Sequence, residues 1–268
     1  VLGTLQATLT DFRYLRNIWK RNTEEEALLG VSLTGIMDCS ITNGSAGEAA
    51  TAKFLSELRE IAVETNKVMA EKLGINQSTA ITCVKPSGTV SQLTDSASGI
   101  HPRFSEYYIR TVRADKKDPL ATAMISSGFP YEEDVMNNSN WVFSFPQKSP
   151  PGSVTVDDLG SIEQLNLWKI YQDNWCEHKP SMTCYYNDDT FFEVCQWIWK
   201  NFDKVSGISF LPQSEHVYKQ APYQKITKED YDILNSKFPK GMEWDLEESD
   251  DNTEGSQTLA CVAGVCEL

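Results

Sequence analysis

One stretch of this sequence combines residue types that could hold a phosphate group. This stretch follows a β-rich segment, 80–84, and Lys85, and it leads into an expected short helix. Its residues are Pro86, Ser87, Gly88, Thr89, Val90 and Ser91. The first turn of a helix offers free backbone N–H groups, and a glycine lets an anion approach the backbone closely. The run predicts a phosphate-binding loop, although Ser87 or Thr89 could simply cap the helix. The Gly-Lys-Ser/Thr ending of nucleotide-hydrolysing loops is absent.

A second stretch has the chemistry of a thiol pair. Cys261 and Cys266 are separated by four residues, and Gly264 between them permits a tight bend, so their sulfur atoms can come within disulfide range. Half a zinc site and two unreactive thiols are the alternatives. A zinc site would require two further ligands, and the acidic tail offers no additional cysteine or histidine.

The remaining cysteines indicate packing rather than metal binding. The spacing of Cys176, His178, Cys184 and Cys195 matches no zinc pattern, and this segment is rich in tryptophan and tyrosine. Cys39 and Cys83 lie in strand-like runs and are expected to be buried thiols. We therefore expect no metal site. Seven cysteines without a disulfide framework indicate a reducing cytoplasm.

Charge separates one basic segment from an acidic chain. The formal net charge is -14, which argues against a nucleic-acid-binding protein. The segment 85–117 nevertheless carries six basic residues against three acidic ones, which suits a small polyanion. No apolar run has the length of a membrane span, so we expect no membrane association.

The elements that must position these residues alternate between helix and strand, which is typical of an α/β fold with parallel strands. We expect helices, in order, at 3–28, 46–73, near 113–127, at 156–175, 189–201 and 227–238. We expect strands at 31–37, 80–84, 107–112, 141–145, 182–186 and 205–211. Residues 1–240 are expected to form the folded α/β part of the chain and 241–268 a flexible acidic tail, with 243–260 as its tether.

Several runs resemble the monomeric, adenosylcobalamin-dependent class of ribonucleotide reductases. The similarity is most specific in the block 84–113, through Val84–Leu93, Ser98–Ser105 and Tyr107–Arg113. It also includes Leu2–Thr10, Val31–Asp38 and the cysteine-bearing C-terminus. The chain would then be the C-terminal part of such an enzyme, and residues 1–240 would be the C-terminal part of its catalytic domain, the second half of a ten-stranded α/β barrel.

The resemblance implies roles for both stretches. The loop 86–91 would hold the phosphates of a ribonucleoside triphosphate, with His101 and Arg103 as candidate further contacts. His101 could equally be a turn residue and Arg103 a surface cation. Cys261 and Cys266 would carry electrons from thioredoxin, or a similar reductant, to the active site.

The family's radical-forming motif, Asn-Pro-Cys-Gly-Glu, does not occur in this sequence. We therefore expect the chain to be inactive alone, to need an N-terminal part, and to leave adenosylcobalamin binding largely to that part. A nucleotide-binding module without catalysis is an alternative. The large subunit of a reductase with a separate radical-generating subunit is another.

Overall fold

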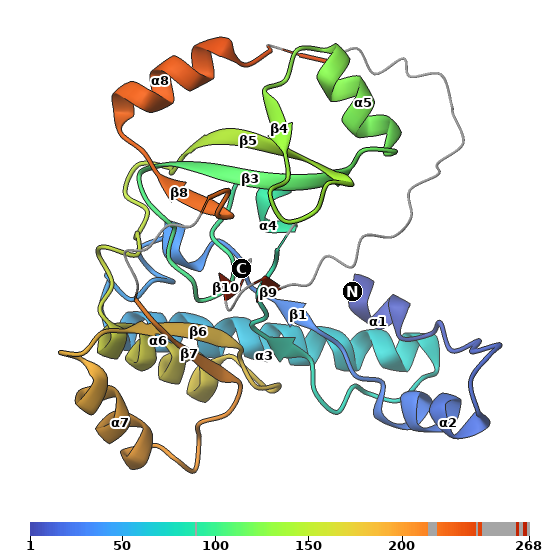
Figure 1. Ribbon diagram of the computed structural model, residues 1–268. Helices are drawn as coiled ribbons and strands as arrows, with labels where there is room; N and C mark the ends of the chain where they lie inside the picture. Colours follow the sequence, from blue (N-terminus) through green and yellow to red (C-terminus); the bar gives the residue numbers. More distant parts are fainter. Residues whose placement is uncertain (89, 214–218, 240, 243–260, 263–264, 267–268) are drawn as a thin grey trace. The chain divides into compact units, whose positions relative to one another are not determined.

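The structure, a computed structural model, describes residues 1–88, 90–213, 219–239 and 241–242, and the backbone of 261–262 and 265–266. The chain divides into two compact units (Figure 1). The first comprises Val1–Pro102 and Gly152–Gln213, and the second comprises Arg103–Pro151 with the described residues of 214–267. The predicted tether 243–260 lies outside the described residues. None of the helices in the described ranges combines the length and apolarity needed to cross a bilayer.

The first unit contains helices and two short parallel sheets. Its helices are α1 (Leu2–Gln6), α2 (Asn17–Glu26), the 3-10 turn η1 (Ile36–Asp38), α3 (Glu48–Leu73), α4 (Val90–Leu93), α6 (Ser161–Asn174) and α7 (Phe191–Lys200). Its strands are β1 (Val31–Ser32), β2 (Thr82–Cys83), β6 (Met182–Tyr186) and β7 (Ile208–Pro212). β1 pairs with β2 and β6 with β7, both in parallel.

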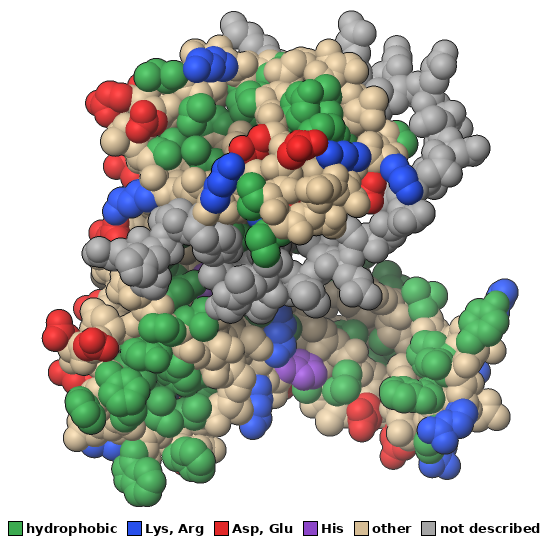
Figure 2. Space-filling model, viewed as in Figure 1, with side chains coloured by type: hydrophobic (Ala, Val, Ile, Leu, Met, Phe, Trp, Pro, Cys, Tyr) green, Lys and Arg blue, Asp and Glu red, His purple; other side chains and the backbone are tan. Residues whose placement is uncertain are grey.

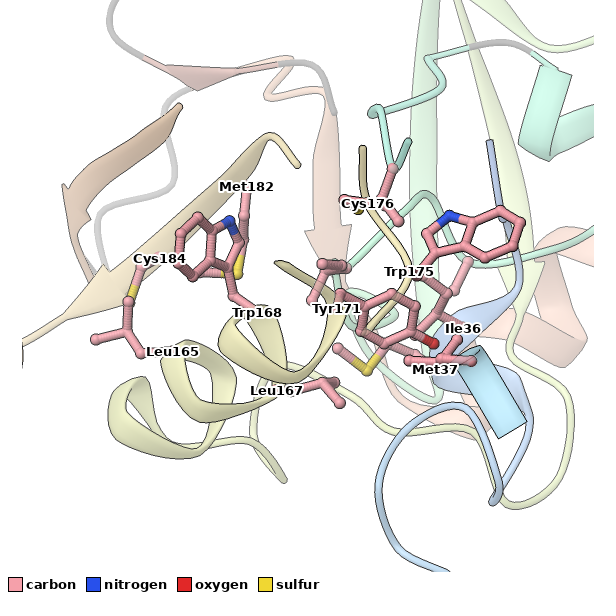
Figure 3. Close-up of a cluster of buried hydrophobic side chains, with 14 of the residues drawn as sticks. Ile36, Met37, Leu165, Leu167, Trp168, Tyr171, Trp175, Cys176, Met182 and Cys184 are labelled. Carbon is pink, nitrogen blue, oxygen red and sulfur yellow. The ribbon is translucent and has the colours of Figure 1, made fainter. Parts of the chain in front are cut away.

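Helix α6 supplies much of the core of the first unit. Leu165, Trp168 and Tyr171 on this helix are fully buried and belong to one cluster with Ile36 and Met37 of η1; Figure 3 shows Tyr171 beside Met37. The Trp168 indole N–H donates to the Pro180 carbonyl oxygen at 3.1 Å, so the buried ring has its polar atom satisfied. The cluster also includes cysteine and methionine side chains of adjacent segments: Cys176, Met182 and Cys184.

The second unit is built on one antiparallel sheet. Its strands are β3 (Tyr107–Asp115), β4 (Tyr131–Glu133), β5 (Asn140–Lys148) and β8 (Tyr223–Lys225), in the order β4-β5-β3-β8. Its helices are α5 (Pro119–Ser126) and α8 (Lys228–Lys237). Asp118 starts α5 by accepting a hydrogen bond from the Leu120 N–H at 2.8 Å, with Pro119 in the first helical position. The backbone pair β9 (Cys261–Val262) and β10 (Val265–Cys266) is also antiparallel.

The mixed α/β character is confirmed, and the parallel arrangement holds for β1–β2 and β6–β7 but not for the second unit. The barrel stays a prediction, because the described strands form four separate sheets. The single helix expected at 3–28 is wrong. The Thr8 hydroxyl donates a hydrogen bond to the Leu5 carbonyl oxygen, and the Thr10 hydroxyl donates one to the Glu24 carboxylate at 2.8 Å. These side-chain hydrogen bonds stabilise the break between α1 and α2.

The strand expected at 31–37 is also shorter than predicted. Gly35 has a φ of 71°, a left-handed conformation that glycine adopts without strain. The chain therefore leaves β1 and turns into η1, which carries Ile36 and Met37 into the core. Apolar residues in this run reflect burial in a turn rather than continuation of a strand.

Candidate functional site

The predicted phosphate loop connects β2 to α4. The Ser87 hydroxyl oxygen accepts a hydrogen bond from the Ser91 N–H at 2.9 Å, and the Ser91 hydroxyl donates to the Ser87 carbonyl oxygen at 2.7 Å. Ser87 thus caps the short helix, as the simpler interpretation of the sequence allows, and Ser91 is fully buried. Thr89 lies outside the described residues.

The electrostatics of this loop depend on more than its helix. Helix α4 has only four residues, so its dipole is small, and backbone N–H groups and nearby cations must supply most attraction for an anion. Lys85 directly precedes the loop, and its backbone N–H donates to the Ser32 hydroxyl oxygen at 3.0 Å. Its ammonium donates to the Lys179 carbonyl oxygen at 2.8 Å and to the Ser181 hydroxyl oxygen at 3.0 Å.

A second segment, residues 96–101, lies against the loop; we call it the brace. The Ser98 hydroxyl oxygen accepts the Ser87 N–H at 2.7 Å. Gly99 has a φ of 53°, and an added Cβ there would lie 3.3 Å from the Lys85 carbonyl oxygen, so the brace also packs closely against the residue that precedes the loop. Ser98 is not among the predicted phosphate contacts, although its pairing with Gly99 in the sequence is a turn signal.

His101 is bonded through both ring nitrogens. Its Nε2 lies 3.0 Å from the Thr183 backbone N–H, which can only donate, so Nε2 must accept and the proton must be on Nδ1. Nδ1 then donates to the Ser98 carbonyl oxygen at 2.9 Å. Burial lowers the pKa of His101, with the Ser98 hydrogen bond opposing this shift. The ring is therefore neutral and engaged by the backbone, so its predicted contact with phosphate would require it to break one of these bonds.

Acid is expected to destabilise the fold through His101. Because its folded-state pKa is depressed, the unfolded chain binds the proton more readily. The stability that the neutral ring contributes is fully present above the pKa of histidine in the unfolded chain, about 6.5. It is lost as the pH falls toward the lower pKa of His101 in the folded protein, by at most about 1.4 kcal/mol per pH unit. Urea unfolding between pH 7 and 5 should show a smaller loss for His101→Gln than for wild type. Identical pH dependence in the two proteins would contradict this assignment.

Arg103, the other candidate phosphate contact, is buried and lies in the second unit. In the same unit the buried Asp134 carboxylate pairs with the Arg113 guanidinium at 3.2 Å. Arg113 also donates to the Gln220 carbonyl oxygen at 3.0 Å, which fixes the segment before β8. Because Arg103 is buried, it is not the surface cation that the sequence left as an alternative, and its contact with phosphate stays a prediction.

The scattered cysteines divide into buried and exposed thiols. Burial raises the pKa of Cys176 and of Cys184 to about 12, which suits unreactive core residues. Cys83 is buried, as predicted, but Cys39 is exposed, so that expectation is wrong. Cys39 follows η1, and hydrogen bonds from Ile41 and Thr42 lower its pKa. Within the described residues, no three potential ligands are grouped closely enough to hold a metal ion.

The C-terminal cysteines are paired in backbone register. Strands β9 and β10 place Cys266 opposite Cys261, with Val265 opposite Val262. Directly opposed residues in antiparallel strands have Cα atoms about 4.5–5.5 Å apart, a separation that falls within the range of disulfides. This backbone arrangement is compatible with a reversible dithiol–disulfide pair.

Comparisons with known proteins identify relatives of this chain. It is 31% identical to the adenosylcobalamin-dependent ribonucleoside-triphosphate reductase of Euglena gracilis over 220 residues, which are 80% of this chain and 30% of that protein. It is 24% identical to the enzyme of that name from Lactobacillus gasseri over 287 aligned residues, or 96% of this chain and 38% of the relative. No protein-family model matches.

The fold has a solved counterpart. A crystal structure of a B12-dependent (class II) ribonucleotide reductase matches with a TM-score of 0.77 and 23% identity, covering 90% of this chain and 38% of that one. The chain is thus a homologue of these reductases, and it spans about a third of their length.

Proposed function

From this kinship with adenosylcobalamin-dependent ribonucleoside-triphosphate reductases, we propose that the chain is the C-terminal part of such an enzyme. The complete enzyme would reduce ribonucleoside triphosphates to 2′-deoxyribonucleoside triphosphates. The similarity over 80% of the chain to a reductase of that name carries the proposal. The present part would contribute substrate-phosphate binding and a dithiol tail.

Substrate binding is assigned to the loop 86–91. The loop follows the buried strand β2, so its backbone is anchored on one side, and α4 anchors it on the other. Gly88 gives the triphosphate access to the backbone, while Ser87 and Ser91 hold the turn in shape through their mutual hydrogen bonds. The phosphates are thus assigned to the backbone around Gly88, on a turn held in shape by hydroxyl groups, together with the Thr89 hydroxyl that the sequence supplies.

The tail is assigned the transfer of reducing equivalents. Replacement of the 2′-hydroxyl by hydrogen consumes two electrons and two protons and releases water, so one dithiol in the active site becomes a disulfide. The Cys261 and Cys266 thiols then reduce that disulfide by thiol–disulfide exchange and become a disulfide themselves. Thioredoxin, or another outside dithiol, returns the tail to its reduced form and is itself oxidised.

The radical chemistry is assigned to the N-terminal part, because the Asn-Pro-Cys-Gly-Glu motif is absent here. Adenosylcobalamin, when bound there, supplies the radical. The buried His101 uses both ring nitrogens for backbone groups, and His178 lies 2.6 Å from the Leu29 carbonyl oxygen through its Nε2, so neither is assigned to the cofactor. This chain's own residues would bind the substrate phosphates and deliver electrons in a reducing, cytoplasmic setting.

Substrate binding is tested by Gly88→Val in the complete reductase. The side chain should block the approach of phosphate, and loss of even one charge-assisted hydrogen bond weakens binding about tenfold or more. The matched control is Gly160→Val, because φ is -72° there and an added Cβ meets only the Glu163 side chain, at 3.4 Å. Calorimetric titration with a ribonucleoside triphosphate gives the dissociation constants. Unchanged affinity in Gly88→Val would leave the loop as a helix cap alone.

A further inference from the structure

We propose that Ser98 and His101 are positioning residues that set the shape of the phosphate loop from outside it. This inference rests on the proposed role of that loop and names residues that shape it without touching the substrate. It starts from one contact: the Ser87 N–H donates to the Ser98 hydroxyl oxygen at 2.7 Å, so this N–H faces the brace rather than a bound anion.

The brace is fixed independently of the loop at its N-terminal end. The Ala97 N–H donates to an Asp38 carboxylate oxygen at 2.7 Å, which ties the brace to η1. The Ala97 carbonyl oxygen accepts from the Gly35 N–H at 2.7 Å and from the Thr34 hydroxyl at 3.0 Å. Ala97 itself is buried, so these bonds are shielded from water.

The brace is also fixed at its C-terminal end. The Gln164 amide on α6 donates to the Ile100 carbonyl oxygen at 3.1 Å, and Ile100 is fully buried. The neutral His101 ring connects the Thr183 N–H of β6 to the Ser98 carbonyl oxygen. The same carbonyl oxygen accepts the His101 backbone N–H at 3.1 Å, so two donors hold the Ser98 peptide.

These bonds form one connected path from β6 to the loop. Thr183 orients the His101 ring, the ring orients the Ser98 peptide, and the Ser98 hydroxyl holds the Ser87 N–H. Ser87 in turn caps α4 through its own hydroxyl. Ser98 and His101 therefore fix the direction of the Ser87 N–H and the shape of the turn that follows it, and no contact between His101 and the anion is needed.

The test uses Ser98→Ala and inorganic tripolyphosphate as the probe. Loss of the Ser98 hydroxyl should weaken tripolyphosphate binding to the 268-residue chain between about twofold and tenfold, the effect of one neutral hydrogen bond. The Ser87 amide should also exchange its hydrogen faster in this variant. Ser98→Thr keeps a hydroxyl and should restore both properties. Ser45→Ala, at an exposed serine outside the loop and the brace, is the control and should change neither.

A second pair of variants tests the histidine. Glutamine at position 101 keeps a donor and an acceptor, so His101→Gln should bind tripolyphosphate more tightly than His101→Leu, which keeps neither. If wild type binds tripolyphosphate and Ser98→Ala binds it equally well, the positioning role is overturned and the loop's phosphate role stands. If wild type does not bind it, the phosphate role of the loop fails, and this inference fails with it.

Discussion

A complete reductase with serine in place of Cys261 and Cys266 is expected to lose thioredoxin-driven turnover while its first turnover survives. The pre-reduced active site can act once, because its own dithiol supplies the two electrons. Every later turnover requires the tail to reduce the internal disulfide, and a hydroxyl group cannot take part in thiol–disulfide exchange. The register that places Cys266 opposite Cys261 is the structural basis of this expectation.

The measurement compares two reductants in the same double variant. Deoxynucleotide formation with thioredoxin should collapse, whereas a small dithiol that diffuses to the active site should restore part of it. The control is Cys195→Ser, an exposed thiol on α7 that should leave both rates unchanged. Equal losses with both reductants, or a wild-type rate with thioredoxin, would remove the shuttle role. Loss of a structural zinc pair would instead lower the stability of the protein whichever reductant is supplied, so unchanged stability of the double variant would count against the zinc alternative.

Trp168→Ala is expected to cause the largest loss of stability. The ring is fully buried, packs edge-on against Trp197 at a centroid distance of 6.3 Å, and donates to the Pro180 carbonyl oxygen. Truncation of a buried tryptophan leaves a cavity and lowers the free energy of unfolding by about 3–5 kcal/mol. The Pro180 oxygen also loses its partner.

The matched control for this substitution is Trp199→Ala on α7. Trp199 is 83% exposed, and Figure 2 shows hydrophobic side chains gathered on the surface over this helix. Its truncation should change the free energy of unfolding by no more than about 0.5 kcal/mol. Urea unfolding gives both values from the midpoint and slope. Similar losses in the two variants would mean that burial does not distinguish these tryptophans.

The sequence by itself determined the elements that depend on local pattern. Helix α3 was expected at 46–73 and occupies Glu48–Leu73, because its apolar spacing and the stop at Gly74 are both local signals. Gly74 has a φ of 68° and ends the helix with its N–H on the Ala70 carbonyl oxygen. Strand β6 and the loop-to-helix junction at 86–90 were likewise read from residues adjacent in the chain.

Only the tertiary structure decided what depends on contacts between distant segments. The ring of His101 is engaged by Thr183, 82 positions away, so its neutral state and its place in the brace have no local signature. Arg103, two residues further on, belongs to the other unit. Cys39 and Cys83 both lie in strand-like runs of the sequence, yet Cys39 is exposed and Cys83 is buried. The spacing of apolar residues in the sequence indicates which side chains are buried, whereas the residues that pack against each of them are determined by the tertiary structure.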